Sequence, residues 1–454
     1  MELNNIKKVF LIGIGGIGMS GLARYFKKRG CVVYGYDKTA TSLTNSLIDE
    51  GIPVVFIDDV DRIPTNFRKN DDGTLIIFTP AIPNNSIILN CFKENGFSLK
   101  KRSEVLGIIS KSMFTIAVAG THGKTTTSSI IAHILKDSGY DCSAFLGGIA
   151  TNYNSNILFG ENNTVVVEAD EYDRSFLTLH PNIAVITSMD ADHLDIYGDK
   201  DQLTESFQLF ASQVKSGGKL IHRKGLALNQ GVSYAANDDC EAQAFNINIR
   251  DGKFYFDFKN SNTEIIDVQL SLPGLHNIEN AVAAIEVALT LGISTESIKL
   301  ALSNFKGVKR RFEYIVNTPQ QIFIDDYAHH PEELKACISA VKALYPDKKL
   351  TTIFQPHLFT RTRDFATGFA DALSMTDELI MLEIYPAREL PIPGVNSQMI
   401  LNKVLIAEKQ ICGKQEAIEF IRNRKPELLL TVGAGDIDTL IKPLQTLFLN
   451  VEAN

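Results

Sequence analysis

Short apolar runs rich in β-branched residues alternate with helical stretches along almost the whole chain. This alternation is typical of parallel α/β sheets, because a parallel strand reaches its neighbour through a long crossover that is usually a helix. The 454 residues suffice for about two to four domains. The expected strands form three groups, at residues 9–13, 32–36 and 75–78, at 115–119, 165–169 and 183–187, and at 322–325, 350–354, 378–382 and 428–432.

Composition and charge exclude several classes of function. The net charge of −8 argues against a general nucleic-acid binder, which needs a basic excess to neutralise phosphates. The six cysteines are dispersed and form no C-x-x-C pair, which suits a reducing cytosol better than a zinc site or a disulfide framework. The early apolar stretch at 9–19 is broken by glycines and is too short to span a bilayer. We therefore expect a cytoplasmic protein without a signal peptide or a membrane helix.

A glycine-rich loop follows the first expected strand and leads into a helix. Its glycines fit G-x-G-x-x-G, a spacing that lets the backbone approach a pyrophosphate at the helix N-terminus. Asp37 ends the next strand, where a ribose hydroxyl would be held. On this loop alone a NAD-dependent oxidoreductase is favoured, while a packing turn and a site for another nucleotide diphosphate stay open. The glycines are Gly13, Gly15, Gly16 and Gly18.

A second glycine loop follows the strand at 115–119 and opens another helix. Backbone N–H groups of such a loop wrap phosphate oxygens, its lysine reaches the outer phosphates, and the next hydroxyl binds Mg²⁺. The spacing G-x-x-G-K-T is shorter than usual, but the strand–loop–helix context predicts a nucleoside triphosphate site. A redox enzyme has no need of this second loop, whereas a kinase or ligase with a nucleotide-tagged substrate uses both. The loop residues are Gly120, Thr121, His122, Gly123, Lys124, Thr125 and Thr126.

Acidic side chains collect at the carboxyl ends of two neighbouring strands of the second group. Four carboxylates within residues 168–173 repel one another unless a cation lies among them. A solvated acidic turn is the alternative. Mg²⁺ prefers oxygen ligands and phosphates, so a histidine ligand here would be unusual. The residues are Glu168, Asp170, Glu171 and Asp173 after one strand, and Asp190, Asp192, His193 and Asp195 after the next.

Other polar residues follow later strands or open helices. Asn277 and Asn280 face one side of an Ala-rich helix, where amides can read an adenine edge or Asn277 can cap the helix. Polar, cationic and aromatic groups at strand ends of the third group suggest a cleft for a carboxylate, with a solvated surface as the alternative. Arg311 lies at a domain junction and could reach the outer phosphate of ATP. The strand-end groups include Asp325, Asp326, Tyr327, His329, His330, His357, Arg361 and Arg363.

Two boundaries divide these features. A short charged helix at 100–112 precedes the first strand of the second group, and a basic segment at 307–313 precedes the first strand of the third group. Alternation within 245–272 predicts antiparallel strands inserted in the middle. The chain is therefore predicted to be an α/β protein of three domains. They are a Rossmann-like domain at 1–107, a P-loop ATPase-like domain with a parallel sheet and a small antiparallel insert at 108–312, and a Rossmann-like domain at 313–454.

Taken together, these residues resemble the Mur ligase family, the ATP-dependent amide-forming enzymes of peptidoglycan precursor synthesis. The resemblance covers essentially the whole chain, in the family's order. It rests on Gly120-Thr-His-Gly-Lys-Thr-Thr126, Glu168-Ala-Asp-Glu171, Asp192-His193, His276-Asn277 through Asn280-Ala281, Arg311-Phe-Glu313 and Asp325-Asp-Tyr-Ala-His-His-Pro331.

Within the family, three stretches at 13–20, 354–362 and 383–387 resemble the member that adds L-alanine to UDP-N-acetylmuramate. The rival is a recycling ligase that adds a tripeptide to the same sugar nucleotide and lacks the Gln-Pro-His stretch with a nearby Thr-Arg-Thr. The resemblance implies that the lactyl carboxylate takes the γ-phosphate of ATP to form an acyl phosphate, which the amine of alanine attacks. It implies ATP and Mg²⁺, with Mn²⁺ as an alternative ion, small-molecule partners, and a monomer or homodimer.

The resemblance also implies roles for single residues. Lys124, Glu168, His193 and Arg311 would be catalytic, and Thr125, Glu168 and His193 would ligate the metal. ATP would be bound by loop residues 120–126 with Asn277, Asn280, Arg311 and Asp326. The incoming amino acid would meet Tyr327, His329 and Arg361. The UDP-sugar would be held by Gly13, Gly15, Gly16, Gly18, Asp37, Thr79, Ala81 and Ile82.

The chain departs from relatives at three positions. Tyr172 and Arg388 stand where many relatives have Ser and Gly. Several relatives use a carbamylated lysine after the Asp-His stretch. Here Gln208 falls at about that position, within the lysine-free residues 206–213, so a carbamate is not carried over.

Overall fold

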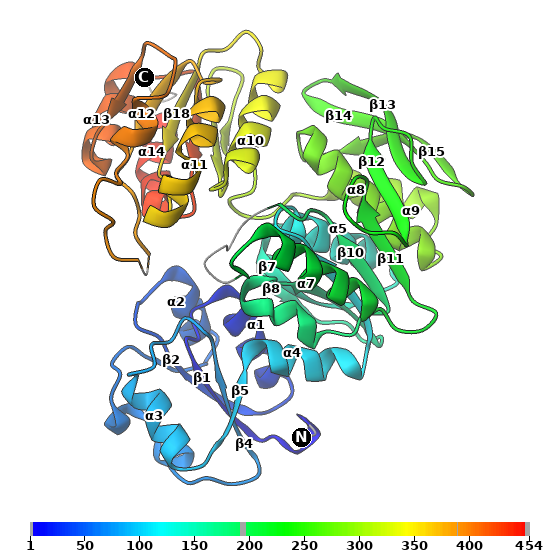
Figure 1. Ribbon diagram of the computed structural model, residues 1–454, viewed down its shortest axis with the longest axis vertical. Helices are drawn as coiled ribbons and strands as arrows, with labels where there is room; N and C mark the ends of the chain where they lie inside the picture. The colour runs from blue at the N-terminus through cyan, green and yellow to red at the C-terminus, as the bar shows by residue number, and fades with distance from the viewer. Residues whose placement is uncertain (1–2, 191–196, 388, 450–454) are drawn as a thin grey trace. The chain divides into compact units, whose positions relative to one another are not determined.

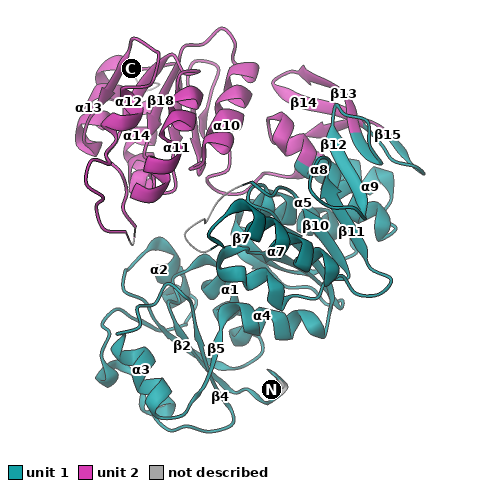
Figure 2. Ribbon diagram, viewed as in Figure 1, with its two compact units in different colours: residues 1–243, 258–264, 280–302 teal, residues 244–257, 265–279, 303–454 magenta. Residues whose placement is uncertain are grey.

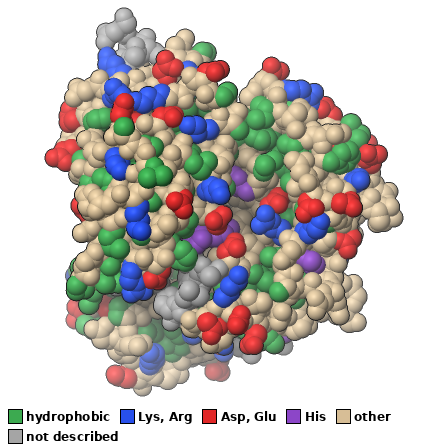
Figure 3. Space-filling model, turned by 45° about the horizontal axis from the view of Figure 1, so that its top comes forward, with side chains coloured by type: hydrophobic (Ala, Val, Ile, Leu, Met, Phe, Trp, Pro, Cys, Tyr) green, Lys and Arg blue, Asp and Glu red, His purple; other side chains and the backbone are tan. Residues whose placement is uncertain are grey.

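The computed structural model describes residues 3–190, 197–387 and 389–449 and divides into two compact units (Figures 1 and 2). Unit 1 comprises residues 1–243, 258–264 and 280–302, and unit 2 comprises 244–257, 265–279 and 303–454. In the parts of the chain that are described, no helix combines the length and the apolar character that crossing a membrane requires. Acidic and basic side chains are interspersed over the face seen in Figure 3.

The first sheet, in unit 1, has five parallel strands in the order β3-β2-β1-β4-β5. Its central strand β1 is apolar on both faces: Leu11 packs in one buried cluster with Leu22 and Phe26, and Phe10 packs in another with Phe92. The strands are β1 (Lys8–Ile12), β2 (Val32–Tyr36), β3 (Val54–Val55), β4 (Thr74–Phe78) and β5 (Ser98–Lys101). The helices are α1 (Ile17–Lys28), α2 (Ser42–Asp49), α3 (Ile87–Glu94) and α4 (Arg102–Lys111).

The second sheet has ten strands in the order β15-β14-β13-β12-β11-β10-β6-β9-β7-β8. The pairs from β12 to β7 are parallel, and β8 is antiparallel to β7. Short loops join β13 to β14 and β14 to β15, and such connections link antiparallel neighbours. The strands are β6 (Phe114–Ala119), β7 (Ser143–Ala150), β8 (Ser155–Leu158), β9 (Thr164–Ala169), β10 (Ile183–Ile186), β11 (Lys219–Arg223), β12 (Val232–Ala236), β13 (Ala242–Arg250), β14 (Lys253–Lys259) and β15 (Glu264–Leu270). The helices are α5 (Lys124–Asp137), the 3₁₀ segment η4 (Tyr172–Thr178), α7 (Lys200–Ser212), α8 (Leu275–Thr290) and α9 (Thr295–Asn304).

The third sheet, in unit 2, has six strands in the order β16-β17-β21-β18-β19-β20, and only the edge strand β16 runs antiparallel to its neighbour. Buried clusters cover both of its faces. The strands are β16 (Glu313–Asn317), β17 (Ile322–Asp326), β18 (Leu350–Phe354), β19 (Glu378–Met381), β20 (Lys409–Ile411) and β21 (Leu428–Val432). The helices are α10 (Pro331–Leu344), α11 (Phe359–Leu373), α12 (Gln398–Leu401), α13 (Lys414–Arg424) and α14 (Ile441–Leu449).

All ten strands expected from the sequence are confirmed, as is the α/β class with parallel sheets and a mixed central sheet. The candidate residues fall where those strands end. Gly120 follows β6, Glu168 lies at the end of β9, and Asp326 ends β17. The carboxyl ends of parallel strands share one edge of a sheet, where ligands of open α/β sheets bind.

Candidate active site

The second glycine loop has a backbone that only glycine adopts without strain. Gly120 and Gly123 have φ of +137° and +84°. A Cβ at Gly120 would lie 2.8 Å from the backbone nitrogen of Ser188, and a Cβ at Gly123 would lie 2.8 Å from Asn280 Oδ1. The loop turns directly into α5, whose first residue is Lys124. The unpaired N–H groups and positive dipole end of such a helix suit a phosphate.

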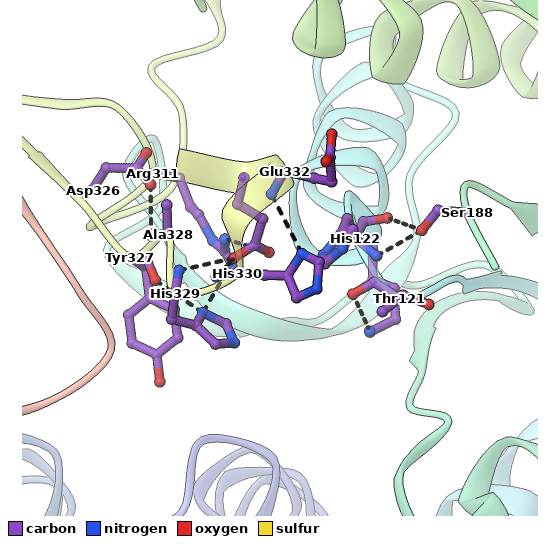
Figure 4. Close-up of polar contacts among 12 residues, drawn as sticks. Thr121, His122, Ser188, Arg311, Asp326, Tyr327, Ala328, His329, His330 and Glu332 are labelled. Carbon is purple, nitrogen blue, oxygen red and sulfur yellow. Dashed lines mark hydrogen bonds and ion pairs between the residues drawn. The ribbon is translucent and has the colours of Figure 1, made fainter. Parts of the chain in front are cut away.

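Residues that follow β10 hold this loop in place (Figure 4). The N–H of His122 donates to Ser188 Oγ at 2.7 Å, and Thr187 Oγ1 donates a short hydrogen bond to the His122 carbonyl. Thr121 Oγ1 donates to the Asp190 carbonyl at 2.9 Å. The neighbouring strand therefore fixes the loop before any ligand binds.

Lys124 is folded back onto its own loop. Its Nζ donates to the Gly120 carbonyl at 2.6 Å and forms an ion pair with Glu171 at 2.8 Å. Burial lowers the pKa of Lys124, but Glu171, Glu168 and Asp170 outweigh it, and the net pKa is raised. The amine is therefore a cation. Glu171 belongs to the acidic stretch that the sequence singled out, but no local pattern showed that it would pair with Lys124.

Glu168, which the sequence predicted to ligate a metal, lies near the carboxyl end of β9. Its Oε2 accepts the Gly147 N–H at 3.0 Å. Thr125 is the second residue of α5 and is buried. A carboxylate and a hydroxyl are the oxygen donors that Mg²⁺ prefers, so this pair fits that ion. Within residues 3–190, 197–387 and 389–449, no three His, Cys, Asp or Glu side chains gather as a metal site. His193, the third predicted ligand, lies outside the described residues.

The first glycine loop is braced by the residue expected to hold a ribose. Gly13 has φ of +86°, and its N–H donates to the Tyr36 carbonyl at 2.8 Å. Asp37 Oδ2 accepts the Gly15 N–H at 2.8 Å, so its carboxylate supports the loop itself. A Cβ at Gly13 would meet Thr79 Cγ2 at 2.6 Å and Ile82 Cδ1 at 3.3 Å. The structure thus brings Thr79 and Ile82 to the loop. Between them Ala81 is exposed, and Gly16 caps α1.

The two asparagines of α8 differ in their surroundings. Asn280 Oδ1 accepts from Thr127 Oγ1 at 3.0 Å and lies beside Gly123, which places Asn280 at the phosphate loop. Asn277 Nδ2 donates to the Pro273 carbonyl at 2.6 Å. The alternative that Asn277 caps the helix is wrong, because α8 begins two residues earlier, at Leu275.

A second polar cluster forms where β17 ends, in unit 2 (Figure 4). Asp326 accepts the N–H groups of Phe312 and Ala328, each at 2.7 Å. Burial raises the pKa of Asp326 to about 6, against the lowering effect of Arg311 and of these two N–H groups. Arg311 lies over the Tyr327 ring, with Cζ 5.2 Å from its centroid. This arrangement ties the domain-junction segment to the end of β17.

Tyr327, His329 and Arg361 lie in one connected group. His329 Nδ1 lies 3.0 Å from the Tyr327 carbonyl and 3.2 Å from Glu333 Oε2, which are both acceptors, so Nδ1 carries the proton. Burial lowers the pKa of His329 to about 4; Glu333 raises it, and Arg361 and Arg311 lower it further. His329 is therefore neutral, with Nε2 as an acceptor, and Arg361 carries the positive charge.

Glu333 and Tyr385 of this group were not assigned to a site from the sequence, whereas His357 and Arg361 were among the strand-end groups of the expected cleft. Arg361 is buried, and its Nη1 lies 3.3 Å from His357 Nδ1. His357 stacks on Tyr385 with centroids 5.8 Å apart and makes an edge contact with His329. Glu333 holds His329 from the first turn of α10. The only local signal was the spacing of four residues between His329, which precedes α10, and Glu333 in the first turn of α10.

Comparisons with known proteins agree with this arrangement. The model described as Mur ligase family, catalytic domain, matches residues 8–113. The Mur ligase middle domain matches 118–288, and the Mur ligase glutamate ligase domain matches 310–435. The UDP-N-acetylmuramate–L-alanine ligase of Flavobacterium psychrophilum is 52% identical over 97% of this chain and 98% of its own length. That of Parabacteroides distasonis is 48% identical over 98% of each chain.

Two solved structures share the fold. The UDP-N-acetylmuramate–alanine ligase from Thermotoga maritima superposes with a TM-score of 0.85 at 27% identity, covering 98% of this chain and 99% of the other. The murein peptide ligase from Psychrobacter arcticus superposes with a TM-score of 0.70 over the same shares. Its 23% identity to this chain shows the shared fold alone.

Proposed function

The chain belongs to the Mur ligase family, and on that basis we propose that it joins L-alanine to UDP-N-acetylmuramate with consumption of ATP. One observation carries the proposal: ligases named for this reaction are 46–52% identical to the chain over at least 97% of its length. The tripeptide-adding alternative has weaker support. The solved ligase of Neisseria meningitides that is named for it covers 67% of this chain with a TM-score of 0.60, whereas the solved alanine ligase covers 98% with a TM-score of 0.85. An NAD-dependent oxidoreductase would leave the second phosphate loop without a use.

We propose the domain limits 1–107, 108–312 and 313–454 for the UDP-sugar, ATP and amino-acid domains. The family models that match 8–113, 118–288 and 310–435 support them. The proposed partners are small molecules, and we propose a cytoplasmic monomer or homodimer that binds neither nucleic acid nor membranes. The net charge of −8 supports the absence of nucleic-acid binding, and acidic and basic side chains are interspersed on the one face that Figure 3 shows.

In the proposed reaction the lactyl carboxylate attacks the γ-phosphate of ATP, the bond to the β,γ-bridging oxygen breaks, and an acyl phosphate and ADP form. The alanine amine then attacks the acyl carbon, and phosphate leaves from a tetrahedral intermediate. Lys124 would move from the Gly120 carbonyl and Glu171 to the outer phosphates, where a buried cation stabilises the transferring phosphoryl group. Thr125 and Glu168, with His193, would hold Mg²⁺ or Mn²⁺, which supplies charge neutralisation at the phosphates.

ATP would also meet residues beyond its phosphate loop. The family resemblance assigns Asn277 and Asn280 to adenine; the two residues share α8, and Asn280 lies at the phosphate loop. Arg311 and Asp326 are assigned to the outer phosphate and the ribose. At the other loop, Gly13, Gly15, Gly16 and Gly18 would bind the UDP diphosphate, with Asp37, Thr79, Ala81 and Ile82 around it.

For the amino acid, we assign Arg361 to the α-carboxylate, because a buried guanidinium matches a carboxylate in shape and charge. The neutral His329 would accept a hydrogen bond at Nε2, and Tyr327 would line the same group. With the α-carboxylate of the amino acid fixed by Arg361, the pocket would discriminate between amino acids by the shape of their side chains. A pocket that senses one methyl group discriminates by roughly 10–200-fold.

A phosphate-release assay tests the function. The full chain with UDP-N-acetylmuramate, ATP and Mg²⁺ should prefer L-alanine, with Gly and L-Ser about 10–200-fold weaker. The tripeptide should be rejected, because a clamp on its distant α-carboxylate would hold its amine away from the acyl phosphate. A tripeptide that outperforms alanine would instead establish the recycling reaction.

A further inference from the structure

Arg102 lies against the first glycine loop without belonging to it. It is the first residue of α4, directly after the edge strand β5. A Cβ at Gly18, in the first turn of α1, would lie 2.8 Å from Arg102 Nη1 and 3.0 Å from its Cδ. The guanidinium therefore covers the start of the helix that the loop opens. A Cβ at position 18 would force the side chain of Arg102 to shift from this position.

The position of Arg102 is fixed by the central part of unit 1. Its Nη2 forms an ion pair with Asp170 at 3.1 Å, across 68 residues of sequence. In the same helix, the Ser103 carbonyl accepts from Thr178 Oγ1 at 2.9 Å. The side chain of Arg102 remains 21% exposed, so a ligand in the loop can reach it.

Helix α1 is tied to the same region. Buried Asn156, in β8, donates from Nδ2 to the Ile17 carbonyl at 2.6 Å and to Ser20 Oγ at 3.1 Å. Arg24 Nη1 donates to Asn156 Oδ1 at 2.7 Å. Asp170, after β9, holds the guanidinium of Arg102, and Asn156, in β8, holds helix α1. The position of the guanidinium relative to α1 is therefore set by contacts within the protein and does not depend on a ligand.

Asp170 stands next to Glu171, which is the partner of Lys124. Two neighbouring acids therefore hold one cation at each phosphate loop: Arg102 at the first loop and Lys124 at the second. A guanidinium offers five N–H donors, enough to keep a carboxylate on one edge and bind phosphate oxygens with the others.

We propose that Arg102 binds the diphosphate of the sugar nucleotide at the first glycine loop, and that Asp170 is the positioning residue that aims its guanidinium there. The inference rests on the proposed function, because it takes the ligand of that loop to be a uridine diphosphate compound. Glycine-loop N–H groups and a helix terminus supply partial charges only. Arg102 adds the full positive charge that a diphosphate requires.

Calorimetric titration of the full chain with UDP-N-acetylmuramate, and separately with UDP, tests this directly. Arg102→Ala should weaken both by roughly 10–100-fold, the range for a hydrogen bond to a charged group. Arg102→Lys should recover part of the loss, since it restores the charge without the planar fork. In steady state, the KM for the sugar nucleotide should rise while the KM for ATP and the kcat at saturation stay within about threefold of wild type.

Lys101→Ala is the matched control. This neighbouring cation also pairs with an acid, with its Nζ 2.8 Å from Asp173, but its side chain is not among the groups nearest to any glycine of the first loop. Wild-type binding by this variant is expected. An equal loss in both variants would show a general charge effect and overturn the role of Arg102, as would Arg102→Ala that binds UDP like wild type.

Asp170→Asn separates positioning from direct contact. If Asp170 acts through Arg102, this variant should weaken UDP binding less than Arg102→Ala, and the double variant should bind no more weakly than Arg102→Ala alone. Additive losses would refute the positioning role. The proposed function has its own test, independent of the role of Arg102: it fails if the wild-type protein releases no phosphate from ATP in the presence of UDP-N-acetylmuramate and L-alanine. Wild type that binds no uridine nucleotide would overturn both.

Discussion

The stability of Asp326→Asn relative to wild type should increase as the pH rises. The carboxyl group is buried at the end of β17, where it accepts two backbone N–H groups. Burial raises its pKa from 3.8 to about 6, although Arg311 and the two N–H groups lower it, and Glu333 raises it further. Ionisation of this group therefore opposes folding.

The sign follows from linkage. In the unfolded chain the group titrates near its ordinary pKa of about 3.9. A group whose pKa is raised in the folded state contributes stability that is fully present below its unfolded pKa. For Asp326 that contribution is lost as the pH rises from the unfolded pKa through the folded pKa of about 6. A shift of about two units corresponds to about 3 kcal/mol. Asparagine keeps the volume and does not ionise, so it avoids this loss. It keeps only one of the two acceptors, and that cost is the same at every pH.

Scanning calorimetry at pH 4.5, 6 and 8 measures the effect. A free-energy change of about 3 kcal/mol moves Tm by about 6–12 °C in a unit of roughly 150–250 residues. Because about 1 kcal/mol is already lost at pH 4.5, the Tm of Asp326→Asn minus that of wild type should rise by about 4–8 °C between pH 4.5 and 8. Asp347→Asn, at an exposed position, should give a difference that does not vary with pH. A constant or falling difference for Asp326→Asn would refute the reasoning.

Three further outcomes are expected. Lys124→Ala should remain folded by circular dichroism but release no phosphate at saturating ATP and Mg²⁺, and near-normal turnover would contradict its assignment. Gly120→Ala should lose ATP binding in a titration and unfold at lower temperature, because its φ of +137° and the nearby Ser188 nitrogen leave no room for a Cβ. Activity should not change when dissolved CO₂ is removed and restored, since residues 206–213 contain no lysine and Gln208 donates to the Ala227 carbonyl at 3.0 Å; rescue by bicarbonate would point to another lysine.

The interior strands were predictable because both of their faces are buried. β17 and β21 have every residue buried, which leaves a continuous apolar run in the sequence. Edge strands lack that signal. β5 has the sequence Ser-Leu-Lys-Lys and no fully buried residue, and the same stretch was expected to start a charged helix. The helix is real but begins one residue after the strand, at Arg102.

The glycine loops were also predictable, since a positive φ or a close approach requires glycine at fixed spacing. Partnerships between distant residues were not. The pair of Lys124 and Glu171 spans 47 residues, and no local pattern encodes it. The neutral state of His329 likewise depends on burial among residues from several elements. Sequence patterns identify which residues carry the chemistry, whereas the fold decides their charge state and partners.

The charge balance at Lys124 constrains how ATP can bind. The buried ammonium now satisfies Glu171, which is only 2% exposed. If Lys124 leaves for the phosphates, Glu171 stays buried beside added negative charge, and an uncompensated buried carboxylate costs several kcal/mol. The nucleotide must then arrive with a cation of its own, or Lys124 must contact the phosphates while it keeps Glu171. Since Glu168 lies close enough to raise the pKa of the same lysine, a divalent ion at Glu168 would meet this need for both carboxylates. Lys124, Glu168 and Glu171 therefore balance one another's charges, and ATP that binds together with a divalent ion leaves none of these buried charges unpaired.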